Sequence, residues 1–257
     1  MPLGFAQFWA QLKANPLEPK EIDGSLAQQV ADEEWAKLMH RCPSPRQAKI
    51  EVILDESLKD KMVLAWASRT HVLQNQVWTP SVLTTSAVQR DMLIGVNPSI
   101  PNGWALGCND GMRYDLRSVM RHEILHGLGV SSSVTATSVG YNYGQYCFPN
   151  IMDLAMEDAE GNRLVHGCTF SDSESVYVNG VELFYPKTHL PGSSLSHTEK
   201  PGVLNYQVPP ATCLDLDGKD AQLLEGIGLN CSAPSSSATT PHLSLIFVLL
   251  YMLFVLR

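Results

Sequence analysis

The sequence has few basic residues. Its 257 residues include 18 Lys and Arg against 26 Asp and Glu, which gives a net charge of −8, and no stretch gathers Lys and Arg into a cluster. A nucleic-acid partner needs a basic surface to neutralise its phosphates, so we expect no nucleic acid among the partners of this protein. The 44% hydrophobic composition, with 16 Pro and 18 Gly, is typical of a loop-rich globular protein.

Neither end of the chain carries a conventional targeting or spanning segment. Residues 1–12 lack the basic and the continuous apolar regions of a signal peptide. Near the other end, the Ser-, Ala-, Thr- and Pro-rich residues 232–242 precede the apolar run Leu243–Leu256, which is 14 residues long. That run is shorter than the about 20 residues of a spanning helix and is typical of the removable tail of a glycosylphosphatidylinositol (GPI) anchor signal. We therefore expect an incomplete N-terminus on a secreted, membrane-anchored protein of the cell surface, with a retained membrane peptide as the alternative.

The cysteines lack the Cys-x-x-Cys spacing of a structural zinc site. There are six of them, scattered over loop-like stretches: Cys42, Cys108, Cys147, Cys168, Cys213 and Cys231. An even set of this kind predicts disulfides and an oxidising compartment, with six free thiols in the cytosol as the alternative. The pairing stays open, since six cysteines allow about 15 connectivities.

The hydrophobic patterns predict an α+β fold without internal repeats. Helices are expected near Phe5–Lys13, Leu26–Met39, Leu58–Leu73 and Gly218–Gly226, and from the N-cap residue Asp115 to Gly127 or Gly129. Strands are expected at Ile50–Leu54, Met92–Val96 and, at an edge, Trp104–Gly107. Asn179-Gly180 predicts a tight hairpin within Val176–Phe184.

The helix that starts at Asp115 contains the pattern His-Glu-x-x-His, formed by His122, Glu123 and His126. Residues i and i+4 lie on one face of a helix, so both imidazoles can reach one metal ion. A zinc ion with three protein ligands has a fourth coordination position free for water or substrate. It lowers the pKa of a water bound there to about 7 and polarises a carbonyl. A nearby carboxylate can then act as the general base. Gly129, three residues after the second histidine, lets the chain turn sharply out of the helix. The alternative is that this pattern arose by chance on an amphipathic helix.

The segment His122–Gly129 resembles the metzincin signature His-Glu-x-x-His-x-x-Gly. The third histidine of that signature is replaced here by Ser132. In the leishmanolysin-like metzincins a long insertion separates the glycine from the third histidine, and residues 130–196 would form an insertion of 67 residues.

The resemblance to leishmanolysin-like metzincins favours His197 as the third ligand. The segment Gly192–His197 resembles the stretch before the third ligand of that subgroup, whereas His166 and His189 are the other candidates. Gly202–Tyr206 then lies where the Met-turn of the family is expected, with Leu204 in place of Met. A leucine has a similar volume and can form the same apolar floor. Tyr206 is a candidate for stabilising an oxyanion, with simple packing as the alternative.

The resemblance implies a zinc metalloendopeptidase that acts on polypeptides. It implies a metzincin-like domain over residues 46–231, with a small twisted mixed sheet, the active-site helix and a loop-rich, disulfide-linked C-terminal part. Residues 1–45 then form a segment of unknown role, and residues 232–257 form the spacer and hydrophobic tail. The expected edge strand Trp104–Gly107 would pair with an extended substrate. Two alternatives stay open: a catalytically silent zinc-binding adhesion protein, and a gluzincin-like peptidase with Glu157 or Glu160 as third ligand.

Overall fold

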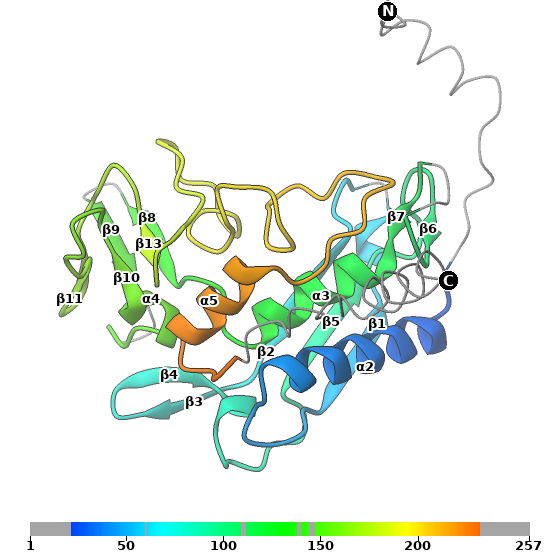
Figure 1. Ribbon diagram of the computed structural model, residues 1–257, viewed down its shortest axis with the longest axis horizontal. Coiled ribbons are helices and arrows are strands. Elements are labelled where there is room, and N and C mark those ends of the chain that lie inside the picture. The colour runs from blue at the N-terminus through cyan, green and yellow to red at the C-terminus, as the bar shows by residue number, and fades with distance from the viewer. Residues whose placement is uncertain (1–21, 60, 109–111, 138–139, 144–146, 232–257) are drawn as a thin grey trace, which may run out of the picture.

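The computed structural model describes residues 22–59, 61–108, 112–137, 140–143 and 147–231 (Figure 1). The predicted helix near Phe5–Lys13 and the hydrophobic tail lie outside these residues. The described helices are α2 (Gly24–Arg41), α3 (Leu116–Gly127), α4 (Ile151–Ala155) and α5 (Gly218–Gly226), with short 3-10 helices η1 (Glu56–Leu58) and η2 (Ser81–Leu83).

The main sheet has three strands, β1 (Ile50–Leu54), β5 (Met92–Val96) and β2 (Ala65–Arg69), in the order β1-β5-β2. β5 is the central strand, parallel to β1 and antiparallel to β2, so the sheet is mixed. α2 packs against β1, and α3 packs against β2 and β5 and also contacts α2 (Figure 1). The structure confirms the α+β class predicted from the sequence.

The N-terminal helix α2 belongs to the same hydrophobic core as the sheet. Its N-cap is Asp23, whose side chain accepts a hydrogen bond from the Leu26 amide at 2.8 Å. Its buried stripe contains Ala27, Val30, Ala31, Glu34, Trp35 and Leu38. A disulfide from Cys42 to Cys231 ties the end of this helix to the last described residue. Residues 22–42 therefore pack as part of one body with residues 46–231.

The predicted helix over Leu58–Leu73 is wrong. The chain instead forms β2 and then β3 (His71–Gln74), which pairs with β4 (Val77–Pro80). Trp66 explains the difference, because its indole lies so close to Gly95 of β5 that a Cβ there would come within 2.3 Å of the ring. Pairing with the exposed edge of β5 and this close packing outweigh the local helical pattern.

The other short-range predictions agree with the structure. β1, β5 and α5 have the predicted bounds, and Asp115 caps α3. The predicted hairpin consists of β13 (Tyr177–Val178) and β14 (Val181–Glu182), joined by Asn179 at φ 49° and Gly180 at φ 75°. The predicted edge strand near Trp104 exists as β6 (Trp104–Ala105), but it pairs with β7 (Tyr114–Asp115), outside the main sheet.

The part of the chain that follows α3 is rich in loops and carries two small antiparallel sheets. One has the order β10-β13-β14, with β10 at Met156–Glu157. The other has the order β11-β12-β9-β8 and consists of Val165–His166, Thr169–Phe170, Gly140–Tyr143 and Val134–Thr137.

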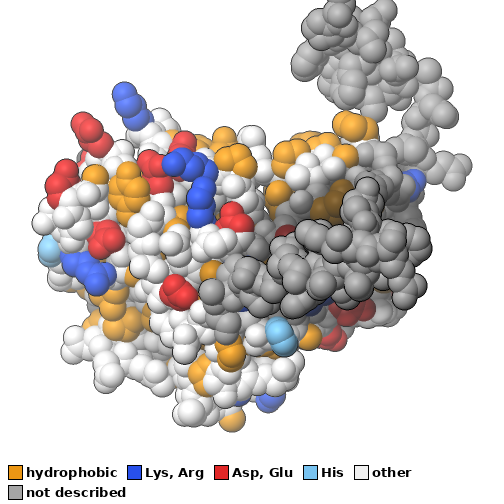
Figure 2. Space-filling view, viewed as in Figure 1, with side chains coloured by type: hydrophobic (Ala, Val, Ile, Leu, Met, Phe, Trp, Pro, Cys, Tyr) orange, Lys and Arg blue, Asp and Glu red, His pale blue; other side chains and the backbone are white. Residues whose placement is uncertain are grey.

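All six cysteines form disulfides: Cys42–Cys231, Cys108–Cys213 and Cys147–Cys168. The prediction of disulfides is confirmed, and they are consistent with an extracellular protein. No helix within the described ranges is long and apolar enough to cross a bilayer. On the face shown in Figure 2, the Lys and Arg side chains stand apart from one another among Asp and Glu, without a basic cluster.

Candidate metal centre and active site

α3 carries two of the three histidines of the site. The Asp115 carboxylate caps it by accepting hydrogen bonds from the Ser118 amide at 3.0 Å and the Ser118 hydroxyl at 2.6 Å. Its apolar positions are buried: Leu116, Val119, Met120, Ile124 and Leu125. This packing fixes the helix, and its spacing places His122 and His126 one turn apart on one face.

Two glycines shape the end of α3. Gly127 packs on Met92 of β5 so closely that a Cβ there would come within 2.6 Å of the sulfur. Gly129 has φ +115°, a conformation that residues with a side chain rarely adopt. The resulting turn brings the Val130 carbonyl back to within 2.6 Å of His126 Nδ1.

The third histidine, His197, reaches the site through long-range backbone hydrogen bonds. The Phe184 amide donates to the His197 carbonyl at 2.8 Å, and the Thr198 amide donates to the Leu204 carbonyl at 2.9 Å. These contacts hold His197 between two other segments of the C-terminal part. Its imidazole thereby lies opposite α3, 71 positions after His126.

The three Nε2 atoms converge on one point. They are separated by 3.0 Å between His122 and His126, 3.2 Å between His122 and His197, and 3.3 Å between His126 and His197. Nitrogen ligands at about 2.0–2.1 Å from a tetrahedral ion lie about 3.3 Å apart. The cluster of His122, His126 and His197 could therefore hold one metal ion, as its spacing fits.

The hydrogen bonds of the three rings fix the same tautomer in each. The Nδ1 atoms of His122, His126 and His197 lie 2.6, 2.6 and 3.0 Å from the carbonyl oxygens of Val203, Val130 and Ser193. A carbonyl only accepts, so each Nδ1 must donate, which leaves each Nε2 without a hydrogen and with its lone pair directed inward.

Burial keeps the imidazoles neutral. It lowers the pKa of His122 to about 4, and it also lowers the pKa of His126 and of His197. Three neutral nitrogens with converging lone pairs repel one another, and a cation between them removes that repulsion. The arrangement is compatible with a metal ion bound between the three rings.

Glu123 lies beside His122 and lines the cleft in front of the cluster. The residue is only 5% exposed, and burial raises the pKa of its carboxyl to about 8. A cation in the histidine cluster would act in the opposite direction and favour the carboxylate. Among the described residues that line this cleft, Glu123 is the one acidic side chain.

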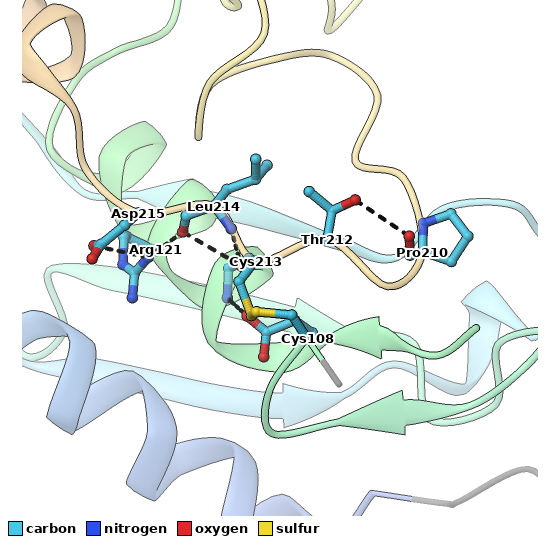
Figure 3. The surroundings of a disulfide bond; sticks show 9 residues. Cys108, Arg121, Pro210, Thr212, Cys213, Leu214 and Asp215 are labelled. Atoms are coloured by element: carbon cyan, nitrogen blue, oxygen red, sulfur yellow. Dashed lines mark hydrogen bonds and ion pairs between the residues drawn. A yellow bond between two sulfur atoms is a disulfide. The ribbon is translucent and has the colours of Figure 1, made fainter. Parts of the chain in front are cut away.

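A buried ion-pair network fixes α3 from behind. Glu34 of α2 is 1% exposed and accepts from Arg121 Nε and Nη2 at 2.9 and 2.6 Å, and from Arg117 at 3.1 Å. Arg121 also donates to the Leu214 carbonyl and lies 3.2 Å from Asp215. Figure 3 shows the contacts of Arg121 with Leu214 and Asp215 beside the Cys108–Cys213 disulfide. Together with the Glu34 pair, they tie the residue before His122 to two distant segments.

The segment with the Met-turn resemblance contacts the cluster through His122. Val203 and Leu204 are fully buried, and the Val203 carbonyl is the partner of His122 Nδ1. Tyr206 lines the cleft and is 40% exposed, with its ring stacked on Phe184 at 4.1 Å. This stacking fits the packing alternative for Tyr206, and its action on an oxyanion stays a prediction.

The cleft in front of the cluster has a volume of about 1030 Å³. Its walls come from residues 62–67, Arg69, α3, and the segments 131–135, 191–197 and 205–209. The strand that borders it is β2, an edge of the main sheet. Trp104–Gly107, the predicted partner strand of an extended substrate, is absent from these walls, and β6 pairs with β7 outside the main sheet. The structure therefore favours β2 over β6 as the strand next to the cleft.

The remaining ligand candidates stay apart from the cluster. His189 lines the cleft but is not part of the group, and His166 is exposed on β11. Glu157 in β10 and the exposed Glu160 are likewise outside the group within the part of the chain that is described. Nothing in the sequence indicated that Arg69 lies on the cleft wall. Glu34 could have been noticed as an acidic residue on the apolar stripe of α2.

Comparison with known proteins yields no match to a protein-family model, to a curated protein or to a solved structure. The functional argument therefore depends on the geometry of the site and on the motif.

Proposed function

We propose that this protein is a zinc-dependent metalloendopeptidase. The observation that carries the proposal is the convergence of three unprotonated Nε2 atoms, at 3.0–3.3 Å from one another, next to Glu123 in an open cleft. Borderline-soft imidazole nitrogens in a tetrahedral arrangement suit zinc, and three protein ligands leave the position that catalysis needs. The resemblance of His122–Gly129 to the metzincin signature supports the same assignment.

The residues of the chain divide the chemistry of peptide hydrolysis between them. His122, His126 and His197 would hold the ion, which supplies a Lewis acid for the scissile carbonyl and a lowered pKa for water. Glu123 accepts a proton from the attacking water and then delivers it to the leaving amine. The Arg121–Glu34 pair and the carbonyls of Val203, Val130 and Ser193 keep the rings in place.

The free edge of β2 supports an extended polypeptide as substrate. Two backbone hydrogen bonds show which residues of β2 face β5: Asn97 N donates to Leu64 O at 2.9 Å, and Thr70 N donates to Asp91 O at 2.7 Å. Because facing alternates along an antiparallel ladder, Ala65, Ala67 and Arg69 present their backbone groups to the open edge. A peptide in the cleft can add to this edge as a further strand.

A metal titration combined with digestion of casein tests the proposed function. We expect zinc in thousandfold excess over its Kd to raise the free energy of unfolding by about 4 kcal/mol, since the ion binds only the folded site. A chelator should abolish both this gain and the digestion, and zinc should restore them. Zinc binding without any digestion would favour the silent zinc-binding alternative, and the absence of zinc binding would refute the proposal.

We further propose that the protein acts at the cell surface, held by a GPI anchor that is added near Ser232–Ser237 and replaces the residues after that point. The three disulfides and the short apolar tail after a Ser- and Thr-rich spacer support this. The test is expression behind a working signal peptide, followed by treatment of intact cells with a phosphatidylinositol-specific phospholipase. We expect release into the medium, whereas retention of the protein with a C-terminal tag still attached would indicate a membrane peptide.

A further inference from the structure

Arg69, the last residue of β2, places a cation in the wall of the cleft. Its Nη1 donates to the His126 carbonyl at 3.1 Å and its Nη2 to the Ser131 carbonyl at 3.4 Å, while Nε donates to His71 Nε2 at 2.8 Å. All three partners are neutral acceptors. The guanidinium therefore lies beside the last turn of α3, close to the metal ligand His126.

Arg69 forms no ion pair with any described residue. Its guanidinium is charged at neutral pH, because arginine keeps its proton in proteins. Asp153 attracts it from beyond ion-pair distance, but the Asp153 oxygens already accept from Ser132, Ser133 and the Asn150 amide. A cation in such surroundings is costly unless an anion joins it, and its remaining Nη hydrogens are free to donate.

The cleft as a whole favours an anionic ligand near this point. Arg69 is the only Lys or Arg among its described walls, and Glu123 is the only Asp or Glu. A divalent ion in the histidine cluster would make the cleft net positive, although the chain carries a net charge of −8. Apolar side chains also line the cleft, and two of them, Met62 and Val63, precede β2, whereas Arg69 is its last residue. The two ends of this segment therefore differ in the side chains that they can bind.

We propose that Arg69, which lines the cleft, is a specificity-determining residue that binds an acidic side chain of the substrate through its remaining guanidinium hydrogens. The inference depends on the proposed function, because it takes a peptide paired with the β2 edge as the ligand. A peptide on that edge passes the Arg69 guanidinium, and a carboxylate can accept two parallel hydrogen bonds from it.

The test uses the zinc-loaded, disulfide-bonded protein and fluorogenic peptides derived from a bond that it cleaves in casein. Each position next to that bond carries Glu in one peptide and Gln in its pair. We expect kcat/KM to favour Glu over Gln by at least about tenfold at one position, because a hydrogen bond between charged groups is lost with Gln. In Arg69→Gln this ratio should fall to about one, and in Arg69→Lys it should be intermediate.

Arg90→Gln is the matched control, since Arg90 pairs with Glu51 at an exposed site outside the cleft. It should keep the full preference for Glu. A ratio is used because a merely structural Arg69, which braces the His126 and Ser131 carbonyls, would slow both peptides equally and leave the ratio unchanged. That result, or a wild-type protein that does not discriminate between Glu and Gln at any position, overturns the inference.

A binding measurement separates this inference from the proposed function. Dissociation constants of Glu/Gln peptide pairs that tile the casein sequence, chosen without regard to cleavage, are measured by fluorescence polarisation with zinc-loaded Glu123→Gln, in which hydrolysis plays no part. A preference for Glu that depends on Arg69 would support the inference even if the wild-type protein hydrolysed no peptide, a result that would contradict only the proposed function. Equal binding of Glu and Gln peptides would contradict the inference alone.

Discussion

Replacing Glu123 with glutamine is expected to lower kcat/KM by about 10²–10⁴-fold, the usual contribution of a general base, while the metal content is unchanged. The amide has nearly the same shape as the carboxyl but cannot accept the proton of the attacking water. The histidine ligands and their carbonyl partners are untouched by this change. The buried position suits a neutral amide, so the fold should be retained.

The measurement pairs the rate of peptide cleavage with metal content by mass spectrometry and with the thermal unfolding midpoint. Glu160→Gln is the control, because Glu160 is exposed and lies outside the histidine cluster. It should behave as the wild type. Loss of zinc together with activity in Glu123→Gln would make Glu123 a structural residue, and undiminished activity would rule out its role as the base.

The elements that the sequence predicted well are those defined by local signals. Asp115 as N-cap and Asn179-Gly180 as a tight turn each satisfy backbone groups within a few residues. The predicted helix Gly218–Gly226 also begins at a local signal, a capping box of Asp217 and Asp220 that the structure reveals. β2 could not be predicted in this way. Its residues form a strand because β5 offers an edge and Gly95 gives room for the Trp66 ring, and both partners lie almost thirty positions further along the chain.

The site shows the same division between local and long-range information. The helical period alone brings His122 and His126 together, so their pairing was predictable from their spacing. His197 was predicted only through a family resemblance, because its approach depends on hydrogen bonds with Phe184 and Leu204 that no local pattern reveals. Arg69 was missed for the same reason, since its place at the cleft follows from the position of β2 at the sheet edge.

Replacing His197 with alanine is expected to weaken zinc binding by more than about 100-fold. Removing a group that only hydrogen-bonds to a metal ligand usually costs about 10–100-fold in affinity, and His197→Ala removes a ligand itself. Two ligands from α3 would remain, and the ion would have water in place of an imidazole. The change also leaves the Ser193 carbonyl without its partner, at a cost of about 1–3 kcal/mol in folding free energy. His197→Asp restores one ligand atom and should recover part of the affinity.

Zinc affinity is measured by competition with a chelating dye, on folded protein verified by circular dichroism. His189→Ala is the sharpest control, because His189 lines the same cleft without belonging to the cluster. It should keep zinc affinity within about threefold, as His166→Ala should, because neither change removes a ligand. If His197→Ala bound zinc like the wild type while either control lost it, the third ligand would be misassigned. If all three variants kept their zinc, His122 and His126 would bind the ion without a third histidine. The site would then lack the three protein ligands on which the proposed catalytic zinc site depends.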